Sequence, residues 1–257
     1  MTSTTKVSLG GTDLTRIGLG TNRLTKTPEN IELVRAAVGA GVNMIDTAHV
    51  YGGGQSEETI GAALSLPADE CLLASKGGAG AGNGRPEVLR AQITESLRRL
   101  RTDRIDLYYL HRVDPETPLE QSLATLEEYR AAGKIDHVGL SAVSVDQIEW
   151  AREVVPVAAV QNHYNLSERR HDEVVDYCTE QGILFVPFFP LGGDRGQAVG
   201  EISERHRATP AQIALAWLVR RSPMMLPIPG TLSLDHVEEN LAALEIELTD
   251  EEFEALR

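Results

Sequence analysis

Cysteine, aromatic residues and positive charge are all scarce in this sequence of 257 residues. Its two cysteines, Cys71 and Cys178, lie far apart and form no Cys-x-x-Cys pair, which excludes a disulfide framework and a zinc ribbon. Lysine and arginine number 24 against 38 aspartates and glutamates, and the resulting formal charge of −14 repels nucleic acid and anionic lipid. The chain is therefore expected to bind neither nucleic acids nor membranes.

Long apolar runs are also missing. No segment approaches the roughly 18 apolar residues that a membrane-spanning helix needs, and Met1–Lys6 lacks the apolar stretch of a signal peptide. The seven histidines show no His-x-His or His-Glu-x-x-His spacing, so no metal site is predicted. With 42% hydrophobic and 24% charged residues, the composition is that of a globular protein, for which we expect a cytoplasmic location.

Short apolar runs do recur along the chain, separated by segments with helical patterns. Several are apolar on both faces, as is typical of parallel strands covered by helices. We count eight such runs: Arg16–Gly20, Val42–Asp46, Cys71–Lys76, Ile105–His111, Ile135–Ser141, Val157–Gln161, Ile183–Phe188 and Met225–Ile228. Eight alternations of strand and helix in about 250 residues favour an α/β fold of the closed (β/α)8 TIM-barrel type over a doubly wound sheet.

The segments between these runs carry helix-start signals. Thr27-Pro28 provides an N-cap and a first-turn proline, and Gly41 can end that helix. Thr209-Pro-Ala-Gln212 and Thr249-Asp-Glu-Glu252 both have the capping-box pattern. The stretch Lys6–Asp13, which contains Gly10-Gly11, indicates a small hairpin at the barrel's base. We predict one domain over residues 1–257, with an N-terminal hairpin cap at 1–15 and a barrel with C-terminal helices at 16–257.

Barrel enzymes place their chemistry at the carboxyl ends of the strands, and here successive apolar runs end in polar residues. The second, third and fourth runs end at Asp46, Lys76 and His111, and the fifth and sixth end at Ser141 and Gln161. One polar strand end is commonly just a contact with water. Three ionisable groups brought together by a barrel instead indicate a reactive site, in which Asp46 compensates the burial of Lys76.

Tyr51 follows Asp46 by five residues and precedes three glycines and a Ser56-Glu-Glu helix start. A lone tyrosine in a loop is usually packed for structural reasons. A phenol with its ordinary pKa of about 10 is a poor proton donor at neutral pH, and a neighbouring cation such as Lys76 lowers that pKa. We therefore expect Tyr51 to lie over the barrel mouth as a general acid.

Together these residues resemble the aldo-keto reductases. The resemblance rests on Asp46-Thr-Ala-x-x-Tyr51-Gly, Lys76, Tyr-Leu-His111-Arg, Gly-Leu-Ser141, Val-Gln161-Asn, Phe-Pro190-Leu-Gly-Gly and Ile228-Pro-Gly-Thr followed by Glu238-Glu-Asn240. These motifs cover nearly the whole chain in the family's order. The resemblance implies a (β/α)8 barrel that binds an extended nicotinamide dinucleotide and reduces an aldehyde or ketone to the alcohol by hydride transfer.

By this resemblance Tyr51 is the proton donor, Lys76 paired with Asp46 lowers its pKa, and His111 orients the carbonyl. The resemblance also implies a set of residues that contact the dinucleotide along its length. These are Gly20, Thr21, Asn22, Asp46, Ser141, Gln161, Phe188, Pro190, Leu191, Gly192, Gly230, Thr231, His236, Glu239 and Asn240. Among them, Phe188 stacks on the nicotinamide, and Gly230-Thr231 leads into a helix whose N-terminus favours an anion.

Two departures from the family pattern affect the cofactor. Ala142 follows Ser141 where the family usually has asparagine, so part of the contact with the carboxamide is either missing or made by another residue. Gly230 and His236 stand where many NADP-selective members have lysine or arginine, although Arg207 could contribute a charge. We expect NADP(H) as the cofactor, with NAD(H) as the alternative, a small carbonyl compound as the substrate and a monomer as the functional form.

Three further features of the sequence allow other interpretations. The stretch Gly77–Gly84 lacks a P-loop pattern and indicates a mobile loop at the rim of the site. A lysine at a strand end near a phenol also suits a Schiff-base aldolase, with Lys76 as the nucleophile. A non-catalytic sensor of the dinucleotide is the third interpretation, against which stands the complete set Asp46, Tyr51, Lys76 and His111.

Overall fold

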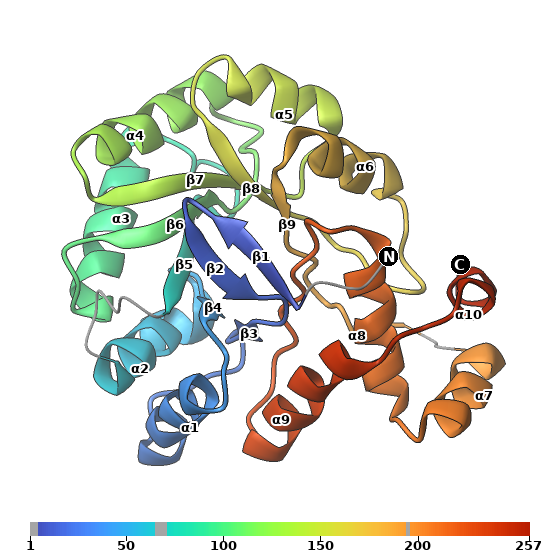
Figure 1. The fold of residues 1–257 in the computed structure, drawn as a ribbon. Helices are drawn as coiled ribbons and strands as arrows, with labels where there is room; N and C mark the ends of the chain where they lie inside the picture. Colours follow the sequence, from blue (N-terminus) through green and yellow to red (C-terminus); the bar gives the residue numbers. More distant parts are fainter. Residues whose placement is uncertain (1–4, 65–70, 194–195) are drawn as a thin grey trace.

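A computed structural model describes residues 5–64, 71–193 and 196–257. Residues 1–4, part of the expected hairpin cap, lie outside the described residues. Figure 1 shows strands at the centre of the molecule with helices around them.

The strands are β1 Lys6–Leu9, β2 Thr12–Thr15, β3 Leu19–Gly20, β4 Met44–Asp46, β5 Leu72–Gly77, β6 Ile105–Leu110, β7 Ile135–Ser141, β8 Val157–Gln161 and β9 Leu184–Phe185. The α-helices are α1 Pro28–Gly39, α2 Gln55–Ala63, α3 Pro86–Leu100, α4 Leu119–Ala131, α5 Val145–Arg152, α6 Asp172–Gln181, α7 Gly196–His206, α8 Pro210–Arg221, α9 Leu234–Ala242 and α10 Asp250–Ala255, and 3-10 turns occur at η1 Tyr51–Gly54 and η2 Ala243–Glu245.

The predicted α/β barrel is confirmed. Within the described residues, β3 to β9 form one parallel sheet in chain order, with each strand hydrogen-bonded to the next. The register places Gly20 beside Asp46, Asp46 beside Ala74, and Ser141 beside Gln161. Because all strands run in the same direction, their carboxyl ends meet at one edge of the sheet.

The eighth apolar run, Met225–Ile228, closes the barrel without forming a regular strand. It bridges to β9 through Phe185 and Met225, and the chain just beyond it bridges to β3 through Gly20 and Gly230. Gly18 N and Gly20 N donate to the carbonyls of Pro227 and Pro229 at 3.0 and 3.2 Å. The expected regular strand is therefore wrong in detail, because these two prolines have no N–H to donate to a ladder.

Side chains alternate between the barrel interior and the helices along each strand, as the period of two in a strand requires. Interior side chains such as Met44, Leu72 and Leu107 form one core, whereas their neighbours Ile45, Leu73 and Tyr108 pack in a second core with the helices. Asp46 follows Met44 by two residues, and Lys76 and His111 follow Leu72 and Leu107 by four, so the period of two places all three on the interior face. The alternation thus directs the polar strand ends into the barrel mouth.

The N-terminal hairpin closes the other end of the barrel, as predicted. Strands β1 and β2 pair antiparallel, and Val7, Leu9 and Leu14 are buried in the interior core. In Figure 1 the hairpin lies across the front of the barrel strands. Gly10 at its turn has φ +59°, and a Cβ there would lie 2.2 Å from His137 Nε2 on β7. Glycine is favoured here by the positive φ, and any other residue would also require the His137 ring to move.

The helix boundaries follow the predicted signals. Thr27 Oγ1 accepts a hydrogen bond from Asn30 N at the start of α1, and Gly41 follows the end of that helix with φ +110°. Thr209 and Thr249 each form a complete capping box, with Gln212 and Glu252 respectively. Cys71 and Cys178 are both buried and free. In the described part of the chain, no helix is long and apolar enough to cross a bilayer.

The glycine-rich loop after β5 differs from its expected role at the rim of the site. Gly82 N and Gly84 N donate to the two oxygens of the Asp114 carboxylate at 3.0 and 2.8 Å, and Gly78 N donates to Gln92 Oε1 at 2.8 Å. Ser122 Oγ also donates to Gly84 O at 2.7 Å. The loop is tied to the segment after β6 and to the helices α3 and α4, and its residues are not among those that line the cavity described below.

Candidate active site

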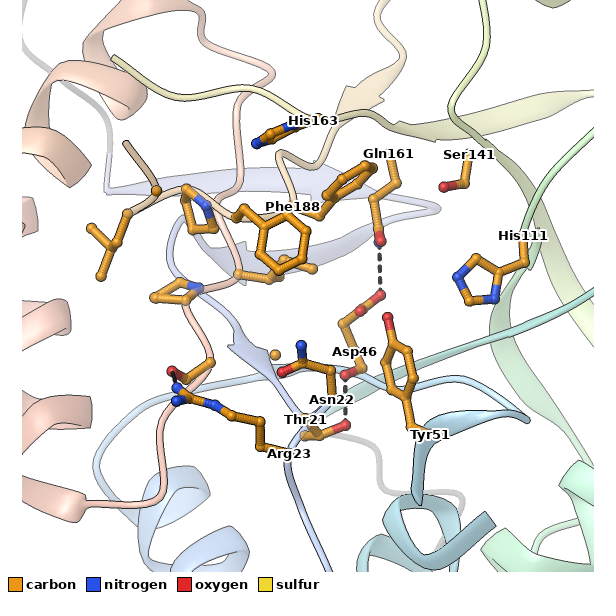
Figure 2. A pocket seen from close by; sticks show the side chains of 18 of the residues that line it. Thr21, Asn22, Arg23, Asp46, Tyr51, His111, Ser141, Gln161, His163 and Phe188 are labelled. Atoms are coloured by element: carbon orange, nitrogen blue, oxygen red, sulfur yellow. Dashed lines mark hydrogen bonds between the residues drawn. The ribbon is translucent and has the colours of Figure 1, made fainter. Parts of the chain in front are cut away.

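Four side chains proposed from the sequence converge at the carboxyl edge of the sheet. Asp46 ends β4, Lys76 is the penultimate residue of β5, His111 follows β6, and Tyr51 begins η1. Figure 2 shows the Tyr51 hydroxyl pointing toward Asp46, with the His111 ring beside it. Residues separated by as many as 65 positions along the chain therefore contribute to one site.

A buried ion pair forms the base of this site. Lys76 Nζ donates to Asp46 Oδ1 at 2.6 Å and to Thr47 O at 2.8 Å, and the two charged side chains are 0% and 2% exposed. Gln161 Nε2 donates to the other Asp46 oxygen at 2.8 Å. Burial disfavours the ammonium, but Asp46 and Tyr51 outweigh it and raise the pKa of Lys76. Lys76 therefore stays charged at neutral pH.

Tyr51 takes the remaining position around this ammonium. Lys76 Nζ lies 3.3 Å from the Tyr51 hydroxyl oxygen and 4.8 Å from the centre of its ring. This leaves the phenol between a buried cation on one side and the cavity on the other. A negative charge that developed on the phenol oxygen would be stabilised by the ammonium.

The loop that carries Tyr51 is fixed on several sides. Its glycines adopt positive φ, and a Cβ at Gly54 would lie 2.3 Å from the Arg99 guanidinium. Arg99 Nη1 donates to His49 O at 3.0 Å and to Glu57 Oε2 at 3.2 Å. Ser56 Oγ hydrogen-bonds to the hydroxyls of Thr21 and Thr47. These contacts hold η1 against β3, β4 and α3.

His111 lies on the other side of Tyr51, with the two ring centres 6.0 Å apart and the rings nearly perpendicular. Its Nδ1 is buried and has no hydrogen-bond partner among the described residues. Burial, together with the cations Lys76 and Arg112, lowers the pKa of His111 to about 3. His111 is therefore a neutral imidazole at neutral pH, with one nitrogen that donates and one that accepts.

A cavity of about 770 Å³ opens in front of these side chains. Most of the residues that the family resemblance implies for catalysis or for binding the dinucleotide line this cavity. These are Gly20, Thr21, Asn22, Asp46, Tyr51, His111, Ser141, Gln161, Phe188, Pro190, Leu191, Gly192 and Gly230. Lys76 lies behind the wall of the cavity. Gly20 allows the barrel to close here, because a Cβ would lie 2.6 Å from Ile228 O.

Four expected cofactor residues do not line this cavity. Thr231 Oγ1 and His236 Nδ1 lie 3.3 Å apart at the start of α9, and the Ser233 side chain makes no hydrogen bond that caps this helix. Thr209 Oγ1 donates to Glu239 Oε1 at 2.5 Å, and Asn240 is buried. These four residues lie together on the segment that begins at Gly230 and continues through α9, next to the cavity but outside its lining.

The structure adds residues that the sequence analysis did not assign to the site. Arg23, Arg112, His163 and Phe189 all line the cavity. The His163 ring stacks on Phe188 at 5.4 Å and 12°, which braces the aromatic wall. Arg23 directly follows Asn22, and Arg112 directly follows His111. Their position next to predicted site residues was the only indication in the sequence that they line the cavity.

Ala142, the departure noted after Ser141, has φ +57° and is exposed. This left-handed conformation is uncommon for alanine and favours glycine or asparagine. The methyl group offers no hydrogen bond at this strand end.

Comparison with known proteins agrees with this geometry. The model of the Aldo/keto reductase family matches residues 16–196 and 194–257, which together are almost the entire chain. The chain belongs to the aldo/keto reductase family. The expectation drawn from the sequence motifs is thereby confirmed, and the chain is an oxidoreductase.

Among curated relatives, this aldo/keto reductase is 37% identical to an uncharacterized oxidoreductase of Schizosaccharomyces pombe, over 97% of this chain and 88% of that protein. It is 34% identical to the pyridoxine 4-dehydrogenase of Escherichia coli, over 97% and 96% of the two chains. Relatives at this identity span essentially the same length of chain.

Solved structures give the same result. A thermostable aldo-keto reductase in complex with the inhibitor epalrestat superposes with a TM-score of 0.90 at 32% identity, covering 98% of both chains. An aldo-keto reductase from Klebsiella pneumoniae in complex with NADPH has a TM-score of 0.88 at 29% identity, covering 98% of this chain and 93% of that one. The aldo/keto reductase barrel therefore accounts for the whole fold.

Proposed function

We propose that this aldo/keto reductase uses NADP(H) to reduce a small aldehyde or ketone to the alcohol, with Tyr51 as the proton donor. The observation that carries the proposal is the position of Lys76 Nζ, which lies 2.6 Å from Asp46 and 3.3 Å from the Tyr51 hydroxyl at the wall of the cavity. NAD(H) is the alternative cofactor.

The residues present fit a nicotinamide dinucleotide. The cavity offers the aromatic face of Phe188, the polar side chains of Ser141 and Gln161, and at its other side the guanidinium of Arg23, whose Nη2 donates to Gly230 O at 2.8 Å. Beyond Gly230 the start of α9 has backbone N–H groups that favour a phosphate. The aromatic ring and the two polar side chains suit the nicotinamide ring with its carboxamide, and the anion-binding end suits a phosphate of the dinucleotide. When bound, the reduced nicotinamide supplies the hydride.

The proton follows a path through residues of this chain. As the carbonyl oxygen gains negative charge, the Tyr51 hydroxyl donates its proton to that oxygen. The Lys76 ammonium stabilises the phenolate that remains, and Asp46 with Gln161 keeps that ammonium in place. Because Lys76 is fully buried, its charge acts on Tyr51 with little screening by water.

His111 has a different role from Tyr51. With its pKa lowered to about 3, the imidazole does not carry a transferable proton at neutral pH. A neutral ring nitrogen can still donate a hydrogen bond to the carbonyl oxygen and orient it toward Tyr51. We therefore assign His111 to orientation and charge stabilisation and Tyr51 to proton transfer.

The aldolase alternative has less support. A Schiff-base lysine must attack the substrate as a free amine that the substrate can reach. Lys76 Nζ is 0% exposed, lies behind the cavity wall and is held as an ammonium by Asp46, Thr47 O and Tyr51. Membership of an enzyme family and the complete set of four polar side chains also favour catalysis over a sensor.

The test is a panel of aldehydes and ketones, pyridoxal included, followed by loss of reduced-nicotinamide absorbance with each dinucleotide. Tyr51→Phe should lower kcat by about 10²- to 10⁴-fold while the dissociation constant of the cofactor changes little, because only the proton donor is removed. Tyr177→Phe, the same chemical change on α6 outside the cavity lining, is the matched control. Wild-type turnover by the Tyr51→Phe variant would remove Tyr51 from the mechanism.

A further inference from the structure

The wall of the cavity carries the opposite charge from the rest of the molecule. The chain has a formal charge of −14, yet the described residues that line the cavity include two arginines and a single acidic residue, Asp46. That carboxylate is already paired with Lys76 and bonded by Gln161. The two guanidiniums of Arg23 and Arg112 therefore remain uncompensated within the site, and a ligand with negative charge would be attracted to it.

Arg112 holds a fixed position beside the catalytic residues. Its Nη1 donates to His111 O at 2.9 Å and to Ser141 Oγ at 3.0 Å, and its guanidinium carbon lies 5.5 Å from the centre of the Phe188 ring. These contacts tie the side chain to the ends of β6 and β7. A guanidinium oriented in this way has already lost much of the rotational freedom that binding a ligand would otherwise restrict.

The rest of the guanidinium is unused. Arginine has five N–H groups, and both of those on Nη1 are occupied by the two hydrogen bonds above. The three N–H groups on Nε and Nη2 have no acceptor among the described residues, and no carboxylate of that part of the chain lies within 4.0 Å of Arg112. The Nε and Nη2 groups form the edge of the fork that binds a carboxylate through two parallel hydrogen bonds.

We propose that Arg112 is a specificity-determining residue that binds a carboxylate group on the carbonyl substrate. The substrate class is then an aldehyde or ketone that also carries a carboxylate, with its carbonyl oxygen at Tyr51 and His111. Because Arg112 is the neighbour of His111 in the chain, the two groups of such a substrate need to be separated by only a few bonds. This inference rests on the proposed carbonyl reduction and adds its substrate class.

Arg23 offers an internal comparison. It lines the same cavity, but Figure 2 shows it on the far side from His111 and Ser141, where its Nη2 donates to Gly230 O. A substrate whose carbonyl is at Tyr51 is therefore expected to meet Arg112 and not Arg23. Charge removal at the two positions should have different effects on the preference for carboxylate substrates.

The experiment compares 4-formylbenzoate with its methyl ester, which has the same aldehyde without the negative charge. The measured quantity is the ratio of kcat/KM for the acid to kcat/KM for the ester, with NADPH at saturation. Arg112→Met keeps the apolar stem of the side chain and should lower this ratio by about 10- to 100-fold, the effect of a lost bidentate, charge-assisted contact. Arg112→Lys keeps the charge without the fork and should give an intermediate ratio.

Two controls identify the cause of the effect. Arg23→Met removes one positive charge from the same cavity and should leave the ratio within about threefold of the wild type. In the wild-type enzyme KM for the acid should rise with ionic strength more than KM for the ester, because Arg112 is exposed and its charge is screened by salt. The dissociation constant of NADPH is measured for each variant by fluorescence.

The outcomes are distinguishable. An unchanged ratio in Arg112→Met overturns the inference, as does an equal fall in Arg23→Met, which would indicate a general effect of cavity charge. A weaker NADPH affinity in Arg112→Met with an unchanged ratio would place Arg112 on the cofactor through Ser141 and would also overturn it. If the wild-type enzyme consumed NADPH with neither these aldehydes nor the wider panel, the proposed function itself would fail.

Discussion

At the scale of single residues, the site depends on one ammonium group that is completely removed from water. An isolated buried charge is costly, and Lys76 is tolerated because Asp46, Thr47 O and Tyr51 surround it. The same arrangement that satisfies the charge also directs it at the phenol. In the proposed mechanism, stability and reactivity at this point therefore depend on the same few hydrogen bonds.

The choice between NADP and NAD is expected to depend on His236 at the start of α9. His236 is exposed at the start of α9 and lies 3.3 Å from Thr231 Oγ1. If the 2′-phosphate of NADP binds there, His236→Arg should tighten NADPH by about five- to tenfold, because arginine adds a permanent charge and a bidentate donor. NADH, which lacks that phosphate, is the control. Equal tightening of both dinucleotides, measured by fluorescence titration, would refute this placement.

At the scale of elements, the site is assembled by loops that rigid contacts hold to the barrel. The loop after β5 and the segment after β6 meet at Asp114. Although burial favours the neutral acid, hydrogen bonds from Glu116 N, Thr117, Gly82 N and Gly84 N outweigh it and lower the pKa of Asp114 to about 2. The ionised carboxylate thus fastens a glycine-rich segment that would otherwise have many conformations.

Asp114→Ala should therefore lower the free energy of unfolding by about 2 kcal/mol at pH 7, because four donors lose their common acceptor. The contribution of a carboxylate with a lowered pKa is complete above its unfolded value of about 3.9 and is lost as pH falls through about 2. The difference between wild type and variant should accordingly shrink between about pH 4 and pH 2. Urea unfolding across this range measures it, and a difference that did not change with pH would contradict the role of the ionised carboxylate.

At the scale of the whole molecule, the barrel is closed by a segment that cannot form a full strand. Arg16, just before β3, reaches the end of α8 and the segment after it. Its guanidinium donates to Val219 O at 2.6 Å in the last turn of α8, and to Ser222 O and, at 3.1 Å, Met225 O beyond the helix. Burial lowers the pKa of Arg16 to about 10, so the group stays charged at neutral pH. One side chain thus joins the first and last parts of the barrel where proline interrupts the ladder.

Arg16→Met should destabilise the molecule by about 3 kcal/mol or more, since several buried carbonyl oxygens would lose their donor. Arg16→Lys, which keeps a charge but has fewer fixed donors, should lose less. Urea unfolding of both variants at neutral pH provides the measurement. A loss below about 1 kcal/mol in Arg16→Met would show that the barrel closes without this link.

Much of this molecule could be predicted from local patterns in the sequence. Capping boxes at Thr209 and Thr249 depend on residues three positions apart, and the strands depend on apolar runs of a few residues, so both can be read without knowledge of the fold. The polar ends Asp46, Lys76 and His111 could be predicted to meet because parallel strands in a barrel have their carboxyl ends at one edge.

Other features depended on contacts between distant parts of the chain. The run Met225–Ile228 contains a proline whose effect on pairing depends on its neighbours, and the glycine-rich loop is tied down by Asp114, which lies 30 or more positions away. Arg112 belongs to the motif that contains His111, but the motif does not show that its guanidinium contacts Ser141 and lines the cavity.

The sequence by itself therefore determined the order of strands and helices, the family, and the four side chains of the proposed chemistry. Each of these depends on a pattern that spans only a few neighbouring residues. Apart from the predicted pair of Asp46 and Lys76, only the tertiary structure decided which charges are paired and which remain unpaired in the cavity. Whether a guanidinium such as that of Arg112 is free to bind a ligand depends on the acceptors that other segments bring within hydrogen-bond distance. Those distances cannot be predicted from the spacing of residues along the chain.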